Sequence, residues 1–404
     1  MLEQRRLDDR LIELVIDAPG VGHTPLRLLL PAGFDADPGR RWPVLYLLHG
    51  GDGDFTDWTD GSQVKEMTSA LDVIVAMPDS GSGATYVDWA YDGPNGRPQY
   101  ETWITELLPD LLKRQFRADD RAVIAGLSAG GFGAMSYAAR HPDRYRAVAT
   151  FSGNLDTRDG DRIGPWLSAV PTLALDRAFP LGDPLTQEVR WRGHNPLDLV
   201  PNLAGVGMFV SNGNGQIGEL SGPLEFTDFL WLESSTERRS RAFVARAAEL
   251  GIPVTTDFYG NGTHSFPWWN RELGRAMPML MAALDRERSA PDSFTYRSVE
   301  PRFSVWDWTF EVSDRADLAF TDVTTDGDEL SVSGNGTLRV TTPPNFVARA
   351  GYQVAGEVVT AGADGRITFV VDLPDNAESY SFGVDLPGPR PTGPAARVDI
   401  AATA

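Results

Sequence analysis

The chain has 404 residues, a formal net charge of −20 and no cysteine. An acidic protein repels phosphate backbones and anionic lipid headgroups, which excludes nucleic acid as an expected partner. The lack of cysteine excludes disulfides, thiolate nucleophiles and cysteine-type zinc sites. The length exceeds what one hydrophobic core usually spans, and a hydrophobic content of 42% is enough to fill two cores.

The termini and the apolar runs bear on location. No apolar run is long enough to span a bilayer, so we do not expect an integral membrane protein. The first ten residues, MLEQRRLDDR, lack the apolar stretch of a signal peptide. We therefore expect either a cytoplasmic protein or one whose leader has been removed.

Strand-like apolar runs alternate with longer amphipathic stretches from about residue 12 to residue 290. This rhythm is typical of a mostly parallel sheet covered by helices, and it predicts an α/β domain over residues 1–290. The predicted strands lie at 26–34, 43–51, 72–79, 121–128, 145–153, 206–215 and 253–262. The predicted helices lie at 100–116, 129–141, 223–251 and 270–288.

Two stretches depart from the rhythm. Residues 154–200 form an insertion rich in Pro and Trp that is too long for a simple connection, and we expect a lid or a wall of the substrate pocket. A helical excursion that only covers the sheet is the alternative. Residues 292–404 are short alternating runs separated by turns such as DGDE and GNGT, which predict a separate antiparallel β-sandwich.

The sharpest local motif is Gly126-Leu127-Ser128-Ala129-Gly130, between a predicted strand and a predicted helix of small residues. A GxSxG motif at such a junction is the nucleophile elbow of α/β-hydrolases, in which the serine sits on a sharp turn. The start of the following helix favours developing negative charge. We therefore predict that Ser128 is a nucleophile.

A serine nucleophile needs a base, and the order of the triad in this fold places a histidine in a loop after the last strand. His264 meets this condition because it follows the strand and glycine loop PVTTDFYGNGT. His141 is expected to cap a helix, His23 and His194 to be structural, and His49 to brace a loop. The acid should follow the strand VGMFVSNG, and its residues leave four candidates open: Glu219, Glu225, Asp228 and Glu233.

The oxyanion hole of this fold takes one N–H from the residue after the nucleophile, here Ala129. The second N–H comes from the loop after an early strand, and LYLLHGGDGD supplies it with Gly51 as the donor. No cluster of metal ligands stands out, and we expect neither a metal nor a cofactor.

Several separated motifs resemble those of the esterase D and antigen 85 mycolyltransferase family. They are PVLYLLHGG, VIVAMPD, YETWITELLPDL, AGLSAGGFGA, HPDRYRAV and GNGTHSFPWW, and they cover roughly residues 12–285. The resemblance implies an α/β-hydrolase fold and a catalytic Glu shortly after the GNG strand end. Aligned on that position, Asp228 is the preferred acid, and Glu225 and Glu233 remain alternatives.

The resemblance also bears on the substrate. The trehalose-mycolate transferases carry an Asp-Gly-Leu-Arg loop where this chain has His49-Gly50-Gly51-Asp52, and the reversed charge favours the broader esterase branch. Many relatives are exported, which favours a secreted or cell-envelope location.

We expect a serine esterase that acts on a small-molecule ester or an acylated glycan or lipid, with acyl transfer to a sugar or glycerol hydroxyl as the alternative. A non-catalytic envelope or carbohydrate-binding protein, whose sandwich contacts polysaccharide, is the rival from another class. The candidate pocket residues are aromatic and polar side chains near the strand ends: Trp58, Tyr86, Asp88, Trp89, Phe266 and Trp268.

Overall fold

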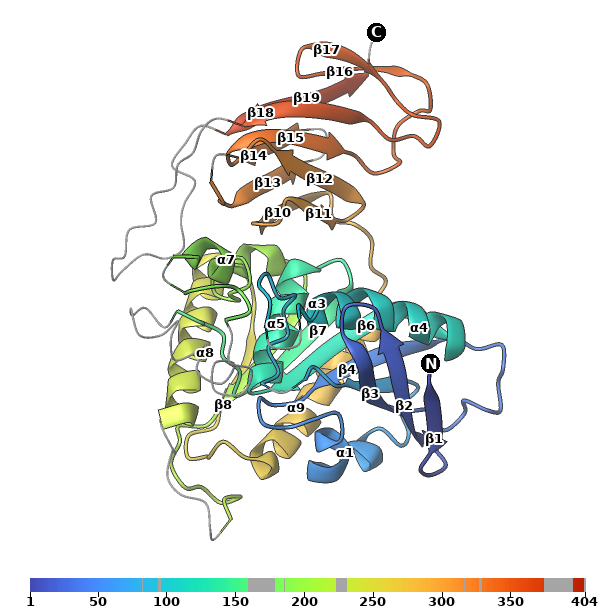
Figure 1. The fold of residues 1–404 in the computed structure, drawn as a ribbon, viewed down its shortest axis with the longest axis vertical. Coiled ribbons are helices and arrows are strands. Elements are labelled where there is room, and N and C mark those ends of the chain that lie inside the picture. The colour runs from blue at the N-terminus through green and yellow to red at the C-terminus, as the bar shows by residue number, and fades with distance from the viewer. Residues whose placement is uncertain are drawn as a thin grey trace.

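The computed structural model of the protein describes residues 1–81, 83–93, 96–158, 179–184, 186–222, 231–315, 317–326, 329–373 and 395–402. Within them, a nine-stranded sheet with helices on both faces is followed along the chain by two smaller antiparallel sheets (Figure 1). The two smaller sheets lie together at one end of the molecule.

The large sheet is antiparallel at its N-terminal edge and parallel from β5 onward. The strands of the parallel part are buried on both faces and therefore read as continuous apolar runs, as parallel strands usually do. In sheet order the strands are β1 (Glu3–Arg6), β2 (Leu11–Ala18), β3 (Gly22–Leu29), β5 (Ile74–Pro78), β4 (Trp42–Leu48), β6 (Ala118–Leu127), β7 (Tyr145–Phe151), β8 (Gly207–Asn212) and β9 (Thr255–Phe258).

Helices cover this sheet in two layers. The described helices are α1 (Asp57–Gly61), α2 (Val64–Met67), α3 (Tyr100–Thr102), the π-helix η1 (Trp103–Leu107), α4 (Leu108–Gln115), α5 (Ala129–Arg140), α7 (Glu188–Arg192), the 3₁₀ helix η2 (Val200–Leu203), α8 (Leu232–Glu249) and α9 (Phe266–Leu284). One apolar cluster joins the sheet to α4, α5 and α8, and a second joins its other face to α1, α2 and α9.

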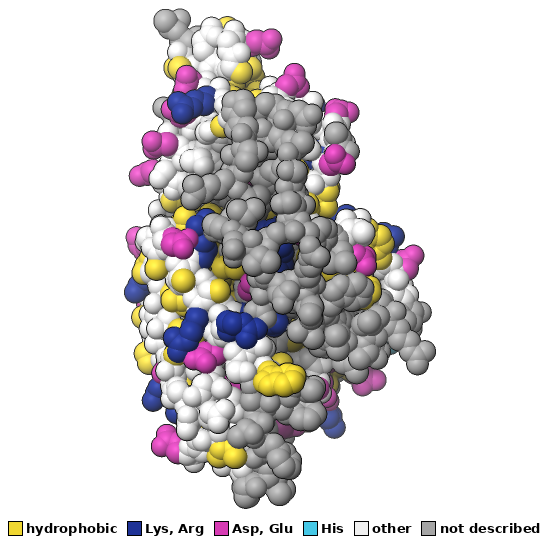
Figure 2. Space-filling view, turned by 90° about the vertical axis from the view of Figure 1, so that its left-hand side faces the viewer, with side chains coloured by type: hydrophobic (Ala, Val, Ile, Leu, Met, Phe, Trp, Pro, Cys, Tyr) yellow, Lys and Arg dark blue, Asp and Glu magenta, His cyan; other side chains and the backbone are white. Residues whose placement is uncertain are grey.

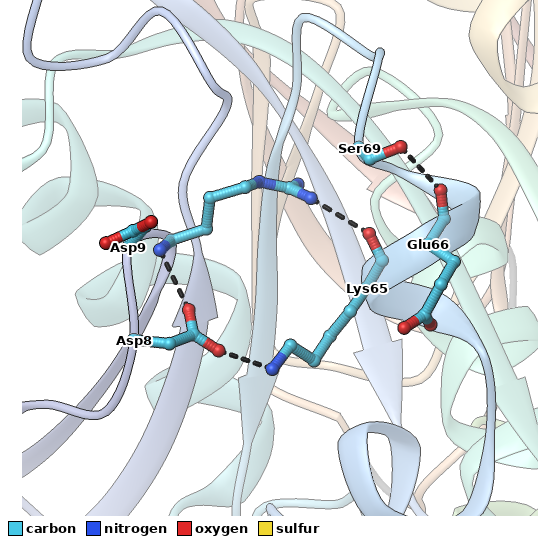
Figure 3. Close-up of a pocket in the computed structure, with 6 residues that line it drawn as sticks. Asp8, Asp9, Lys65, Glu66 and Ser69 are labelled. Carbon is cyan, nitrogen blue, oxygen red and sulfur yellow. Dashed lines mark hydrogen bonds and ion pairs between the residues drawn. The ribbon is translucent and has the colours of Figure 1, made fainter.

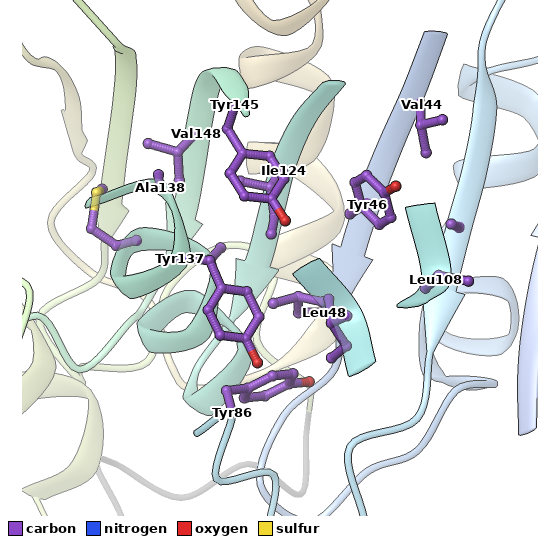
Figure 4. Packing of buried hydrophobic residues seen from close by; sticks show 14 of the residues in the cluster. Val44, Tyr46, Leu48, Tyr86, Leu108, Ile124, Tyr137, Ala138, Tyr145 and Val148 are labelled. Carbon is purple, nitrogen blue, oxygen red and sulfur yellow. The ribbon is translucent and has the colours of Figure 1, made fainter. Parts of the chain in front are cut away.

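Tyrosines fill much of the first layer, beside α5. Figure 4 shows Tyr137 of α5 next to Tyr86, and Tyr46 of β4 near Tyr145 of β7. Both pairs meet edge to face, with ring centroids 6.2 Å and 6.1 Å apart. Such pairs add to the burial of a large apolar area; one joins α5 to the loop of Tyr86, and the other joins β4 to β7.

The C-terminal region forms two antiparallel sheets. The six-stranded sheet has the order β10 (Ser293–Ser298), β13 (Thr321–Asp326), β14 (Glu329–Ser333), β19 (Ala396–Ala402), β16 (Gly351–Val354) and β17 (Glu357–Thr360). The four-stranded sheet has the order β11 (Arg302–Val305), β12 (Trp308–Ser313), β15 (Gly336–Thr341) and β18 (Thr368–Leu373). Residues of both sheets share one buried apolar cluster, distinct from the two clusters of the large sheet.

The seven strands predicted for the first region correspond to β3 to β9. The hairpin of β1 and β2 was not predicted, because its first strand is fully exposed and so lacks an apolar pattern. The described part of the predicted helix 223–251 begins at Leu232, and residues 223–230 lie outside the described residues. Residues 159–178 of the predicted insertion also lie outside them.

Surface charge on one side of the molecule is shown in Figure 2. Acidic side chains are spread along the length of this face, with several Lys and Arg side chains among them, in keeping with the net charge of −20. None of the described helices combines the length and the apolar character that crossing a membrane requires.

Candidate active site

The turn between β6 and α5 carries Ser128. Its φ of 52° and ψ of −119° are rare for a residue with a side chain, and they turn the chain sharply from strand to helix. A Cβ at Gly126 would lie 2.1 Å from the carbonyl oxygen of Gly130, and a Cβ at Gly130 would lie 2.4 Å from that of Leu48. The GxSxG spacing is therefore a steric requirement of this turn.

His264 faces Ser128 from the loop between β9 and α9. Its Nε2 lies 2.9 Å from Ser128 Oγ, and its Nδ1 lies 2.6 Å from Glu233 Oε2. With the proton on Nδ1 donated to the carboxylate, Nε2 is left to accept the hydroxyl proton of Ser128. The side chain of His264 is 16% exposed, so the site stays open to a small molecule.

Glu233 is the carboxylate that the structure brings to His264. It stands in the first turn of α8, and its side chain is fully buried. Its second oxygen, Oε1, accepts bonds from Ser152 Oγ and the Gly213 N–H, both at 2.8 Å. Several donors thus stabilise the carboxylate in a place where an unpaired charge would be costly.

Of the other acid candidates, Asp228, preferred from the sequence, and Glu225 lie outside the described residues. Glu219 is exposed and 3.7 Å from Arg271. Glu233 has the residue type that the resembled family carries, and it lies five residues after Asp228 in the chain.

The loop after β4 lies beside the nucleophile. A Cβ at Gly50 would lie 3.8 Å from Ser128 Cβ, and a Cβ at Gly51 would lie 3.7 Å from Ala129 Cβ. Ala129 is the first residue of α5, so its N–H has no partner within the helix. The structure therefore brings Gly51 and Ala129 together at the position where the sequence predicts two oxyanion donors.

His49 braces the loop after β4 through hydrogen bonds. The ring is 1% exposed, its Nδ1 lies 2.8 Å from the Gly50 carbonyl oxygen, and its Nε2 accepts from the Ser80 N–H at 3.2 Å. Tyr86 donates its hydroxyl proton to the His49 carbonyl at 2.9 Å. These bonds give His49 the bracing role that was expected of it, and they give Tyr86 a structural one.

Three of the predicted pocket residues, Trp58, Trp89 and Asp88, are held by structural contacts. Trp58 is 1% exposed and donates to the Leu48 carbonyl, and Trp89 donates to Thr85 Oγ1 within a buried aromatic cluster. Asp88 accepts from the N–H and hydroxyl of Thr102, and burial raises the pKa of its carboxyl.

The remaining two pocket candidates stand on α9. Trp268 is buried and stacks on Tyr259, with ring centroids 5.0 Å apart. Phe266 is half-buried, two residues after His264, and its ring meets Trp269 edge to face at 5.2 Å. Of the predicted pocket residues, Phe266 therefore keeps both exposure and nearness to the triad.

The other histidines stand away from Ser128. His141 Nε2 lies 2.8 Å from Glu101 Oε1, and His194 Nε2 lies 3.9 Å from Glu101 Oε2. His141 and Glu101, together with Arg140 and Glu300, line a cavity of about 350 Å³ between the large sheet and the C-terminal sheets. His23 is exposed on β3.

A separate surface pocket of about 460 Å³ lies between the turn after β1 and α2 (Figure 3). Asp8 pairs with Lys65 there, and Arg10 donates to the Lys65 carbonyl at 2.9 Å. The bond from Lys65 lowers the pKa of Asp8 to about 2. The pairs tie the N-terminal hairpin to α2.

Among the described residues, no three His, Cys, Asp or Glu side chains are grouped to hold a metal ion.

Comparison with known proteins agrees with this geometry. Residues 22–280 match the profile of the family described as "Putative esterase". The diacylglycerol acyltransferase/mycolyltransferase Ag85B of Mycolicibacterium smegmatis is 30% identical over 290 residues, which cover 67% of this chain and 84% of that protein. Esterase Rv1288 of Mycobacterium tuberculosis is 29% identical over 269 residues, which cover 63% of this chain and 55% of that protein.

Among solved structures, MPT51 (FbpC1) of Mycobacterium tuberculosis is similar with a TM-score of 0.57 and 21% identity, over 67% of this chain and 97% of that one. At this identity the likeness concerns the fold alone, and it confirms the predicted α/β-hydrolase fold with a mostly parallel sheet. The family profile ends at residue 280 and does not reach the C-terminal sheets.

Proposed function

Since the chain belongs to the family described as "Putative esterase" and is an ester hydrolase or acyltransferase, we propose how its residues share the reaction. Ser128 is the nucleophile, His264 the general base, and Glu233 the acid that orients His264. One observation carries this assignment: Ser128 Oγ lies 2.9 Å from His264 Nε2 at a strand-to-helix elbow. Position and hydrogen bonding both match the roles of a serine triad.

The reaction begins as Ser128 Oγ attacks the ester carbonyl while its proton moves to His264 Nε2. The carbonyl oxygen becomes an oxyanion that accepts from the Gly51 and Ala129 N–H groups. Glu233 stabilises the imidazolium through Nδ1–H. The C–O bond to the alcohol then breaks, the alcohol takes the proton from Nε2, and an acyl group remains on Ser128.

The second half of the reaction decides between hydrolysis and transfer. His264 takes a proton from water or from a sugar or glycerol hydroxyl, whose oxygen attacks the acyl carbonyl. The bond between the acyl carbon and Ser128 Oγ then breaks, and Ser128 Oγ takes the proton back from Nε2. We propose hydrolysis as the main reaction, on a small ester or an acylated glycan or lipid. The acidic residue Asp52 beside Gly51 supports this choice, because the resembled transferases carry an arginine there.

The C-terminal region has a proposed place as well. Its own apolar cluster supports a division into a catalytic domain over residues 1–290 and a β-sandwich accessory domain over 292–404. Contact of that domain with polysaccharide and a secreted or envelope location are parts of the same proposal. The location is supported by the resemblance, since many of the resembled proteins are exported.

A fluorophosphonate probe followed by mass spectrometry of the labelled peptide tests the assignment. We expect one label, on Ser128, in the wild-type protein and none in Ser128→Ala. A wild-type protein that takes no label would instead support the non-catalytic binding protein. A panel of p-nitrophenyl esters, run with and without trehalose or glycerol, then separates free acid from transferred acyl product.

A further inference from the structure

A second serine stands beside the nucleophile at the same edge of the sheet. Ser152 follows β7 as Ser128 follows β6, and both residues have a φ of 52°. Ser152 donates its N–H to the Ser211 carbonyl at 2.9 Å, as Ser128 does to the Phe151 carbonyl at 2.9 Å. Ser152 is only 1% exposed, so substrate does not reach its hydroxyl.

The turn that carries Ser152 is tightly packed. A Cβ at the next residue, Gly153, would lie 2.1 Å from Thr150 Oγ1 and 3.0 Å from the backbone of Gly131 in α5. A left-handed φ at a serine costs free energy and persists only where the surroundings hold it. The packing therefore fixes the direction in which the Ser152 side chain points.

The hydroxyl of Ser152 links two residues. It accepts from Trp269 Nε1 at 3.0 Å and donates to Glu233 Oε1 at 2.8 Å. An indole N–H can only donate, and a hydroxyl has one proton, so the bond from Trp269 leaves the Ser152 proton for Glu233. Trp269 therefore donates to Ser152, and Ser152 donates to Glu233.

Trp269 also contacts the base itself. Its ring meets the imidazole of His264 edge to face, with centroids 4.9 Å apart and planes at 88°. Trp269 lies on α9, five residues after His264, and is 7% exposed. One side chain therefore supports the plane of the His264 ring and the serine that contacts its carboxylate.

We infer that Ser152 and Trp269 are positioning residues that hold the Glu233 side chain and aim its Oε2 at His264 Nδ1. The inference rests on the proposed function. A glutamate side chain has three rotatable bonds, and the bonds to Oε1 select the rotamer in which Oε2 faces the imidazole. They also stabilise the charge of a fully buried carboxylate. Neither residue touches the reacting atoms.

The test uses Ser152→Ala with Ser211→Ala as the matched control. Ser211 is the last residue but one of the neighbouring strand β8 and is equally buried, and its hydroxyl has no hydrogen-bond partner among the described residues. We expect kcat on a p-nitrophenyl ester to fall about tenfold in Ser152→Ala with KM within twofold of wild type. Ser211→Ala is expected to stay within twofold in both constants.

A second readout follows the base directly. A proton in a short bond between imidazole and carboxylate gives a far-downfield resonance in proton NMR spectra. We expect the resonance of the His264 Nδ1 proton to move in Ser152→Ala and to stay in place in Ser211→Ala. Equal kcat values and equal resonances in the two variants would overturn the inference.

Trp269→Phe keeps a ring against His264 and removes only the donor to Ser152. We expect a smaller loss of kcat than in Ser152→Ala and no further loss in the double variant, since the indole N–H acts through the serine. Losses that simply multiply would overturn the inference. If Ser152→Ala does not fold, an unchanged kcat in Trp269→Phe would overturn it. The labelling experiment keeps the two hypotheses apart. A wild-type protein that takes no fluorophosphonate label would reject the proposed function itself. If the wild-type protein is labelled, the kcat values and the resonance decide whether Ser152 and Trp269 are positioning residues.

Discussion

The two ends of helix α5 both bury polar groups, but in different ways. At the N-terminal end, two hydrogen bonds join Ser128, His264 and Glu233, and a proton can move along the bond between Ser128 and His264. At the C-terminal end, Arg140 donates to Glu101 at 2.8 Å and to Glu300 of the C-terminal region at 3.0 Å.

The charges at the C-terminal end are held in place. Burial opposes the charge of Glu101, but Arg140 and His141 outweigh it and hold the pKa of that carboxyl well below its usual range. Burial likewise opposes the charge of Arg140, and Glu101 and Glu300 raise its pKa above the ordinary value. Such groups do not exchange protons near neutral pH, so this end is suited to joining two regions and the other end to chemistry.

Ser128→Ala has the largest expected effect and tests whether the N-terminal end of α5 carries the chemistry. We expect kcat on a p-nitrophenyl ester to fall on the order of a thousandfold or more, because the acyl-enzyme cannot form. The free energy of unfolding, measured by urea denaturation, should stay close to that of wild type. An active Ser128→Ala variant would remove the distinction between the two ends of α5.

Glu233→Gln tests the acid. We expect kcat to fall on the order of a hundredfold to a thousandfold, because an amide neither stabilises the imidazolium nor fixes the tautomer with the proton on Nδ1. Steady-state kinetics on the same ester measure the effect. Asp228→Asn is the matched control and should keep its activity; the opposite pattern would return the acid to Asp228.

Arg140→Gln tests the other end. The substitution removes the guanidinium that pairs with the buried carboxylate of Glu101, so we expect the free energy of unfolding to fall by about 3–5 kcal/mol. The exposed Arg114, 3.8 Å from Asp110, offers a control in Arg114→Gln, with an expected change below about 0.5 kcal/mol. Activity per folded molecule should change little in both variants. A large loss of kcat in folded Arg140→Gln would mean that the two ends are coupled.

The smallest expected effect concerns His194. Burial, aided by Arg140, lowers its pKa from 6.5 to about 4, although Glu101 and Glu300 act in the opposite direction. Between these two values the unfolded chain binds a proton that the folded protein does not. The contribution of His194 to the free energy of unfolding should therefore fall by about 2 kcal/mol as the pH decreases from 6.5 to 4.5.

Urea denaturation at several pH values measures the slope of the free energy of unfolding against pH. Glu188 and Glu272, whose pKa values burial raises to about 7, titrate in the same window with the opposite sign, so the test is the difference between variants. Wild type and His23→Gln should lose about 2 kcal/mol more than His194→Gln, since His23 is exposed. Glu101 and Glu300, whose pKa values are lowered, lose their contributions only below about pH 4.5. An unchanged slope in His194→Gln would show that other groups set the acid sensitivity.

Much of the fold could be predicted because its signals are local. The buried parallel strands read as apolar runs, and the elbow reads as GxSxG because a Cβ at Gly126 or Gly130 would collide with backbone. The exposed strand β1 has no such pattern and was missed. The family, the ester chemistry and the parallel sheet followed from these signals and were confirmed by the comparisons.

The sequence by itself predicted the elbow at Ser128, the base His264 and the donors Gly51 and Ala129, since each stands in a motif next to a predicted strand end. Only the tertiary structure brought Glu233 to His264, and only it joined Ser152 and Trp269 to that pair. The physical reason is that residues 152, 233 and 269 approach each other only when β7, α8 and α9 pack. No local pattern encodes the distance between such side chains.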